Sequence, residues 1–538
     1  MGVAATVKLE AGALGGWYLG VVGLSEIDSA IIGGADRDLT ADTRVSDGID
    51  LQYGIQATGP TDRVASSGTM QFTLDNTSQN TAGQQGAFSP GHTNAIAGWD
   101  IGAPVWLSIT YDGTDYYKFN GTVINIEPQS GQYRGQAVRV TAVDYMDDLA
   151  RARVRNVTIQ NDKRADELID TLVSSSVTRS PTQTDYATGQ STFAIALDNL
   201  LDAQTTVLRG VADCVLSELG YLYIKGGTTG KGGVLTFEDR HARPKTVTPA
   251  ATFDNSMVNM VATRKRDDLL NRVNVVVHPR ITDGSTSVLF ELTTTNATPA
   301  VSAGQTITIH CPFREASINA YRVAATTLVT PASSTDYVAN ASSDGSSTNL
   351  TASIDVSISE QAANACELTI TNNAAVTAYL TTLQVRGTAV RDVSETVMSA
   401  TDTISAAKYG EIDARVNMKY ESDVDLAGQM SNWLLNIYKD ARYVVSGFTV
   451  NSNTSDTLMS ASLSLEPGSL ISFSEAMTGI AATGSYGEAV GYFINGVRMH
   501  ISAGSMIQTS WVLQPASAQS AWVLGTSLLD VNTNLAFA

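Results

Sequence analysis

Residues 119–144, FNGTVINIEPQSGQYRGQAVRVTAVD, have a counterpart near the C-terminus at residues 494–516, INGVRMHISAGSMIQTSWVLQPA. Each stretch has an apolar residue and Asn-Gly, then an alternating strand, a turn and a second alternating strand. Period-two alternation is typical of a half-buried β-strand, so we predict an antiparallel hairpin at each place. Although any two hairpins share part of this pattern, we interpret the pair as an internal duplication. In it, Asn-Gly at 120–121 corresponds to Asn-Gly at 495–496.

The composition predicts a folded, multidomain protein. A chain of 538 residues is too long for one hydrophobic core. Hydrophobic residues make up 43% of it and charged residues 16%, which is typical of folded proteins. Many short alternating segments rich in valine and threonine favour β-structure.

The predicted fold class is mainly β, with two small antiparallel β-barrels, a small α/β domain and an inserted β-sandwich-like domain. Residues 199–220 carry apolar side chains at helical spacing, with Gly220 placed to end the helix. We predict an N-terminal arm over 1–44, a first barrel over 45–150, an α/β domain over 151–248, a second barrel with a helix over 249–280 plus 405–538, and the inserted domain over 281–404.

The apolar run from Ala11 to Leu24 is too short for a membrane helix, which needs about 20 residues. Its glycines and the preceding Glu10 suit neither a signal peptide nor an anchor. We therefore interpret it as an arm that packs against the body or a neighbour, and we predict no transmembrane segment.

The three cysteines, Cys214, Cys311 and Cys366, contain no CxxC spacing. This excludes thioredoxin-like redox chemistry and cysteine-rich zinc sites. Each lies on the apolar face of its predicted helix or strand, so we predict buried thiols. A bridge between Cys311 and Cys366 is left open.

The glycine-rich stretch at 225–233, KGGTTGKGG, resembles a phosphate-binding loop but fails its spacing. The position for the first glycine holds Lys225, and Lys231 is followed by Gly232 rather than Ser or Thr. The next residues, VLTFED, form a strand rather than a helix. We therefore predict a hairpin turn.

The cluster Glu238, Asp239, Arg240 and His241 has the residue types of an acid–base or metal site, but a structural salt bridge is favoured at this strand end. The chain has five histidines without HExxH, and it has no GxSxG and no EF-hand loop. We predict no catalytic, cofactor-binding or metal-binding residues, no cofactor and no enzymatic activity.

The formal net charge of −19, without a basic run, excludes a DNA-reading protein. It does not exclude a protein that conducts DNA, because an acidic surface avoids sticking to phosphates.

Five segments share a diffuse pattern of apolar and turn residues: GTMQFTLDN (68–76), GAPVWLSITYDGTDYYKFNGTVINIEP (102–128), VRVTAVDYMDDLARARV (138–154), CVLSELGYLYI (214–224) and GGVLTFEDRHARP (232–244). These segments resemble the opening barrel and middle domain of tailed-bacteriophage minor tail and tail-tip hub proteins (baseplate hubs). The resemblance covers the chain from about residue 45 onward and is weakest in 281–360.

The resemblance implies a structural virion protein at the tail tip, assembled in the host cytoplasm. It implies a homotrimer whose six barrels surround a channel for the tape-measure protein and, later, for DNA that passes without specific binding. Expected partners are the distal tail protein, the tape-measure protein and receptor-binding or fibre proteins. The alternatives are a hexameric distal tail or fibre-anchoring protein and a secreted β-rich adhesin or carbohydrate-binding protein. An enzyme such as a glycoside hydrolase is a third alternative.

Overall fold

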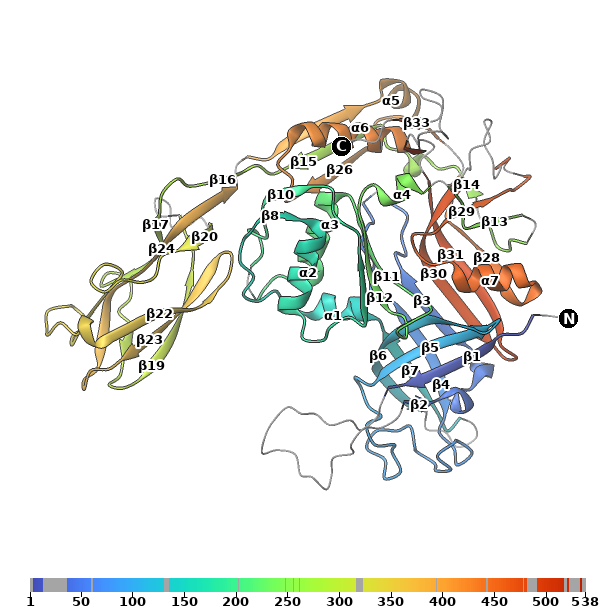
Figure 1. Cartoon of the computed structure of the whole chain (residues 1–538), viewed down its shortest axis with the longest axis horizontal. Helices are drawn as coiled ribbons and strands as arrows, with labels where there is room; N and C mark the ends of the chain where they lie inside the picture. Colours follow the sequence, from blue (N-terminus) through green and yellow to red (C-terminus); the bar gives the residue numbers. More distant parts are fainter. Residues whose placement is uncertain are drawn as a thin grey trace.

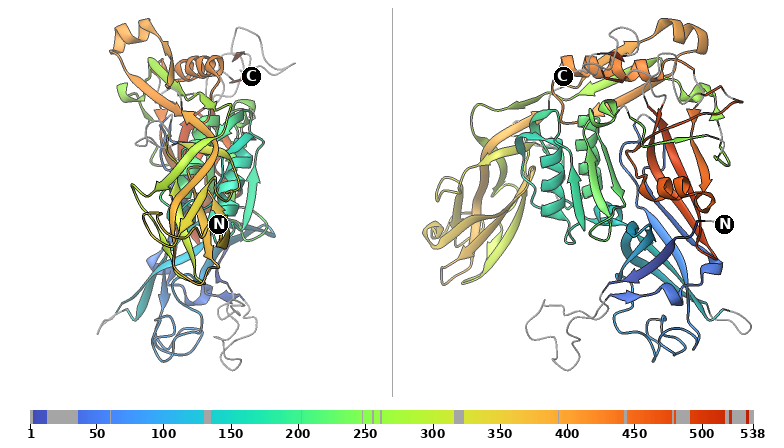
Figure 2. Two further views of the ribbon diagram at one scale, coloured as in Figure 1. Left: turned by 90° about the vertical axis from the view of Figure 1, so that its left-hand side faces the viewer. Right: turned by 45° about the vertical axis from the view of Figure 1, so that its right-hand side comes forward.

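The computed structural model is mainly β and is built of several parts along one long axis (Figure 1). The two β-units predicted as barrels lie at one end, and an inserted β-domain extends at the other (Figure 2). The predicted arm at 11–24 falls outside the described residues from residue 13 onward. The structure describes residues 3–12, 36–59, 61–129, 135–201, 203–246, 248–254, 256–260, 262–315, 323–392, 394–441, 444–477, 479–480 and 491–516, with the backbone of 520–521 and 533–534.

One 12-stranded sheet runs through both regions predicted as barrels. The N-terminal unit consists of β1 (Thr6–Ala11), β2 (Arg37–Asp38), β3 (Ile49–Gly54), β4 (Thr69–Asp75), β5 (Pro104–Tyr111), β6 (Thr114–Gln129) and β7 (Ala137–Val143). The C-terminal unit consists of β13 (Ala251–Phe253), β28 (Gly447–Asn451), β29 (Leu470–Phe473), β30 (Gly491–Ser502) and β31 (Met506–Pro515). Strand β3 joins the units because it pairs with β4 on one side and β30 on the other.

The two units share one topology. In the N-terminal unit the sheet order is β5-β6-β7-β4, and in the C-terminal unit it is β29-β30-β31-β28. Taken in chain order, the four strands are β4 to β7 in one unit and β28 to β31 in the other. In each set the first strand pairs with the fourth, and the third and fourth form a hairpin. This agreement supports the predicted duplication.

The register corrects the predicted correspondence within that duplication. In β6, Val123 exchanges backbone hydrogen bonds with residues 102 and 103, and in β30, Ile494 does the same with residues 468 and 469. A β-bulge follows each residue in its hairpin. Ile494 is thus the counterpart of Val123, and Asn495 corresponds to Ile124 rather than to Asn120. The two Asn-Gly pairs are alike in sequence only.

Neither unit forms a closed barrel within the described residues. In the N-terminal unit, β2 pairs with β1, and a single bridge between Thr43 and Leu74 approaches β4. In the C-terminal unit, β13 pairs with β29, and Val258 bridges Thr449 of β28. The mainly β, multidomain fold class is confirmed, but short connecting segments replace the strands that would close each barrel.

A single hydrophobic cluster fills both units. In the C-terminal unit it contains a group of rings in which Phe448 lies 5.4 Å from Trp511 and 5.2 Å from Phe253 between centroids. Edge-to-face pairs of this kind add about 0.5–1.5 kcal/mol to the stabilisation from burial. The shared core explains why the units form one body.

The α/β domain follows the N-terminal unit. Its elements are α1 (Tyr145–Arg151), β8 (Gln160–Arg164), α2 (Ala165–Ser176), β9 (Gln183–Tyr186), β10 (Thr192–Ala196), α3 (Val207–Glu218), β11 (Tyr221–Lys225), β12 (Val234–Glu238) and α4 (Ala242–Lys245). Helix α3 begins at the Thr206 cap and ends at Leu219 in a left-handed conformation. Gly220 follows, and a Cβ there would lie 2.4 Å from the Glu238 carbonyl oxygen, so the close approach of β12 requires glycine.

A third layer packs across the α/β domain and the C-terminal unit (Figure 1). Its strands are β14 (Ala262–Thr263), β15 (Arg272–Val277), β25 (Thr396–Thr401), β26 (Asp413–Met418) and β27 (Val444–Val445), and its helices are α5 (Thr403–Tyr409) and α6 (Val424–Tyr438). Helix α6 buries Ala427, Met430 and Leu434 against the β25-β15-β26 sheet, as its helical spacing predicts. The remaining helices of the described chain are η1 (Thr40–Asp42), η2 (Val45–Asp47), η3 (Arg266–Asp268), η4 (Thr351–Ser353), η5 (Ser452–Thr454) and α7 (Asp456–Ser464).

The inserted region contains two sheets that face each other across their own core. Its strands are β16 (Arg280–Thr282), β17 (Ser287–Thr293), β18 (Ala300–Val301), β19 (Thr306–Pro312), β20 (Ala324–Leu328), β21 (Tyr337–Asn340), β22 (Ile354–Gln361), β23 (Ala365–Asn372) and β24 (Ala378–Asp392). Strand β24 is the centre of a 6-stranded sheet, and β19-β23-β22 form the other. The buried pair Arg280–Asp198, with a 2.7 Å N–O distance, attaches this domain to the α/β domain.

None of the described helices is long and apolar enough to cross a lipid bilayer.

The three thiols are buried and unbridged, and Cys311 lies directly opposite Cys366 on neighbouring strands. The hydrogen bond with Cys366 and burial raise the pKa of the Cys311 thiol, and burial raises that of Cys214. Because only the thiolate reacts, a colorimetric thiol reagent is expected to modify almost no cysteine in the native chain and all three after unfolding in denaturant. Fast reaction of the native chain would contradict this burial.

Asp144 is expected to make stability depend on pH. Burial raises the pKa of Asp144 to about 7, against backbone hydrogen bonds from Gly68 and Met146 that lower it. A carboxyl whose pKa is raised on folding stabilises the fold below about pH 4, and this contribution is lost as pH rises through about 7. The side-chain amide of the Asp144→Asn variant keeps the cap oxygen but cannot ionise. Relative to wild type, the free energy of unfolding of the variant should therefore rise by about 4 kcal/mol between these pH values, measured by urea unfolding. If the free energies of unfolding of the two proteins changed in parallel with pH, the raised pKa of Asp144 would be contradicted.

Candidate functional site

The outer surface of the shared sheet carries two rows of polar side chains, called here the polar face. Alternation along each strand places apolar residues such as Leu51 and Met499 in the core and their neighbours on the outside. Directly paired residues of adjacent strands lie on the same side of a sheet, so each row can be followed from strand to strand. One row is Asn125, Thr141, Gln71, Asp50, His500, Gln508 and Asn451, and the other contains Thr69, Gln52, Arg498, Ser510 and Thr449.

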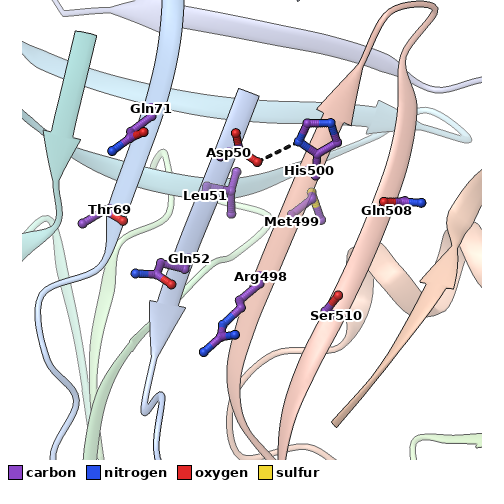
Figure 3. Close-up of a pocket in the computed structure, with 10 residues that line it drawn as sticks. All are labelled: Asp50, Leu51, Gln52, Thr69, Gln71, Arg498, Met499, His500, Gln508 and Ser510. Atoms are coloured by element: carbon purple, nitrogen blue, oxygen red, sulfur yellow. Dashed lines mark hydrogen bonds and ion pairs between the residues drawn. The ribbon is translucent and has the colours of Figure 1, made fainter. Parts of the chain in front are cut away.

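The centre of the polar face is a shallow hollow of about 320 Å³ over β3, β4, β30 and β31. Figure 3 shows Asp50 and His500 joined across β3 and β30, where the carboxylate lies 2.7 Å from Nδ1. Arg498 donates from Nε to Gln56 Oε1 at 2.8 Å. The other side chains that line the hollow are amides, hydroxyls and two aliphatic groups, so it holds hydrogen-bonding groups without a nucleophile–base arrangement.

The polar face is close to electrically balanced. Its two rows contain one carboxylate, Asp50, and one guanidinium group, Arg498, and the paired residues Glu127 and Arg139 beside them add one charge of each sign. The net charge of −19 of the whole chain is therefore not concentrated on the described part of this surface. The polar face therefore presents mostly neutral polar groups, without a strong field of either sign.

The glycine-rich stretch 225–233 is the turn of the β11–β12 hairpin, and its tip packs on β6. Gly227 and Tyr117 exchange two backbone hydrogen bonds of 2.7 and 3.0 Å. Gly232 has a φ of +70°, and a Cβ there would lie 2.8 Å from the Tyr117 Cβ. Glycine is required because of this conformation and this contact, so the turn is a docking point within the chain.

The lysine of this turn is also used within the chain. Lys231 Nζ lies 2.7 Å from an Asp36 carboxylate oxygen and 3.6 Å from the centre of the Trp106 ring. An ion pair and a cation–π contact hold the ammonium group at the N-terminal unit. The turn therefore has the role of a structural connection, as its spacing predicts.

Glu466, just after α7, connects three parts of the fold and was not identified from the sequence. It forms an ion pair with Lys118 of β6, whose side chain is fully buried. The other carboxylate oxygen accepts from the Tyr53 hydroxyl and the Gly226 backbone N–H, each at 2.9 Å. Burial, and then the negative charge of Glu466 and the hydrogen bond to it, raise the pKa of the Tyr53 hydroxyl. Alternation along the strand does not mark this lysine, because Lys118 is the extra residue of a β-bulge between Tyr117 and Phe119.

The Glu238–His241 cluster forms structural ion pairs. Arg240 pairs with the buried Glu218 at 2.9 Å, and Glu238 pairs with Arg243 at 3.0 Å. Burial raises the pKa of Glu218, opposed by Arg240 and by backbone donors. No group of three or more His, Cys, Asp or Glu side chains that could hold a metal occurs among the described residues.

The fold is thus that of a multidomain, mainly β protein with a duplicated β-unit. The chain matches no known protein-family profile. No curated protein sequence matches it.

The solved structures that are similar to most of the chain include three tail proteins. A tail protein from Neisseria meningitidis MC58 has 8% identity and a TM-score of 0.45, covering 95% of this chain and 96% of its own. The 43 kDa tail protein of prophage MuSo2 from Shewanella oneidensis has 10% identity and a TM-score of 0.44, with coverages of 96% and 99%. Prophage tail protein gp18 from Listeria monocytogenes EGD-e has 7% identity and a TM-score of 0.40, covering 94% of each chain.

Proposed function

We propose that the chain is a structural protein of a bacteriophage tail. In this proposal it is a ring-forming hub at the tail tip and has no catalytic role. The observation that carries the proposal is the duplicated β-unit: two copies of one topology share a sheet whose outer face carries rows of polar side chains. A chain with two equivalent units can join a sixfold tube to a threefold tip when three copies form a ring.

In the assembled ring, the polar face lines the channel for the tape-measure protein and then for DNA. Amide and hydroxyl groups with balanced charge do not retain phosphates, because affinity for DNA depends chiefly on neutralisation by Lys and Arg. An acidic channel surface is therefore not required, since a neutral polar face is enough to avoid retaining the phosphates of DNA. The inserted domain projects away from the β-units and is free to contact fibre or receptor-binding proteins (Figure 1).

The proposal is tested by stoichiometry and position. Native mass spectrometry of the full chain is expected to show three copies, and a tag on the inserted domain should appear at the tail tip in electron micrographs of particles. Six copies would instead indicate the distal tail or fibre-anchoring role. A chain that is monomeric in particles, or absent from them, would overturn the proposal.

A further inference from the structure

Strand β3 makes the contact between the two units, and the duplication shows where a second contact of this kind belongs. On one side, β3 pairs with β4, with Gln52 opposite Thr69. On its other side, β3 pairs with the outer edge of β30, with Gln52 opposite Arg498. Both partners of β3 belong to the duplicated topology, so each has a counterpart in the other unit.

The counterpart of β3 in the C-terminal unit is β14. Ile494 pairs with Leu513 as Val123 pairs with Ala142, so Leu513 corresponds to Ala142. Three residues before these two lie Ser510, which pairs with Thr449 of β28, and Arg139, which pairs with Thr73 of β4. Thr449 therefore has the position of Thr73. Thr69, which lies four residues before Thr73, pairs with Gln52 of β3.

Four residues before Thr449, Val445 pairs with Ala262 of β14. Ala262 therefore has the position of Gln52. An independent contact agrees: Val258 donates to the carbonyl of Thr449 at 2.7 Å, as Arg44 donates to that of Thr73 at 2.8 Å.

The counterpart of the β30 edge is the outer edge of β6. Arg498 lies four residues after Ile494, and Glu127 lies four residues after Val123. The edge of β30 is covered by β3, but the outer edge of β6 beyond Val123 has no strand partner among the described residues. The outer edge of β14 has none in the described chain either.

We propose that β14 of one copy pairs antiparallel with the edge of β6 of the next copy, with Ala262 opposite Glu127. The occupant of each edge is a second copy of this chain, because the internal β3–β30 contact joins the equivalent pair of edges within one chain. The contact is head to tail, and a contact of this kind forms a ring when the rotation between successive copies closes. It also removes two exposed sheet edges and extends the polar face from copy to copy.

The charges beside the two edges are complementary. Arg264 and Lys265 follow β14 directly, and Glu127 is exposed at the receiving edge of β6. This inference rests on the proposed ring and adds to it the strands that form the contact between copies.

The test is disulfide trapping in the full-length chain, whose own thiols are buried. In the Ala262→Cys/Glu127→Cys variant, mild oxidation is expected to convert most of the monomer on a non-reducing gel into covalent oligomers that end at a closed ring. A Gln52→Cys/Arg498→Cys variant carries the same pairing inside one chain and should form a bond without changing the oligomer. The register control, Ala262→Cys with Ile126→Cys, points one cysteine to the opposite side of the sheet and should remain monomeric.

The outcomes separate the two proposals. If native mass spectrometry shows a ring but the Ala262/Glu127 pair cross-links no better than the register control, the strand contact is wrong and the ring stands. If neither the purified chain nor assembled particles contain an oligomer, both are wrong. Inter-chain peptides that join residues 127 and 262, found by mass spectrometry of the trapped ring, support the contact.

Discussion

Replacing Glu466 with glutamine is expected to lower the free energy of unfolding by about 3–5 kcal/mol, since removal of one partner leaves a buried charge uncompensated. The Lys118 side chain has no exposed surface, and its ammonium group would keep the Leu463 carbonyl, at 2.9 Å, but lose the negative charge of Glu466. The amide that replaces the carboxylate has one acceptor oxygen, so it cannot accept from Lys118 on one side and from Tyr53 and Gly226 on the other. The variant would also weaken the bonds from Tyr53 and Gly226, so the two β-units and the α/β domain lose a common anchor. Urea unfolding measures the change.

A double-mutant cycle distinguishes this effect from a general loss of packing. The Lys118→Met/Glu466→Gln variant removes both charges and should be more stable than Glu466→Gln alone. The matched control is Glu395→Gln, which breaks the exposed pair with Arg415 and should cost less than about 1 kcal/mol. A loss of similar size at both sites would contradict the role of the buried pair.

Placing lysines on the polar face is expected to turn a neutral surface into one that binds DNA. In the Gln52→Lys/Gln71→Lys/Gln508→Lys variant, three ammonium groups per copy are added around the hollow on β3, β4 and β31. If each neutralises one phosphate, the affinity of the variant for double-stranded DNA should fall about 40-fold between 50 and 200 mM salt. The wild-type chain should bind weakly at both concentrations. Fluorescence anisotropy measures both proteins.

The same variant tests whether the polar face lines the channel. Particles assembled with it should release DNA more slowly than wild-type particles, and infectivity should fall. The control places the same number of lysines on exposed strands of the inserted domain, in a Thr306→Lys/Thr308→Lys/Ser357→Lys variant, and should leave release unchanged. Equal release from the two variants would contradict the proposed path.

Much of the local structure could be predicted from the sequence, because it depends on side chains near one another along the chain. Alternation at 119–144 and 494–516 indicates the hairpins β6–β7 and β30–β31. Spacing identifies the stretch 225–233 as a turn and the cysteines as buried. In each case the signal is a burial pattern or a backbone requirement within a few residues.

The sequence by itself therefore determined which side chains of each strand face outward and that a β-unit is repeated. Only the tertiary structure decided how the repeats correspond, since Val123 and Ile494 are matched by their hydrogen bonds and not by the Asn-Gly pairs. It also decided the partners across the sheet, such as Asp50 with His500. Alternation has a period of two and fixes the face of a side chain, whereas packing in the shared core fixes which distant strand lies beside it.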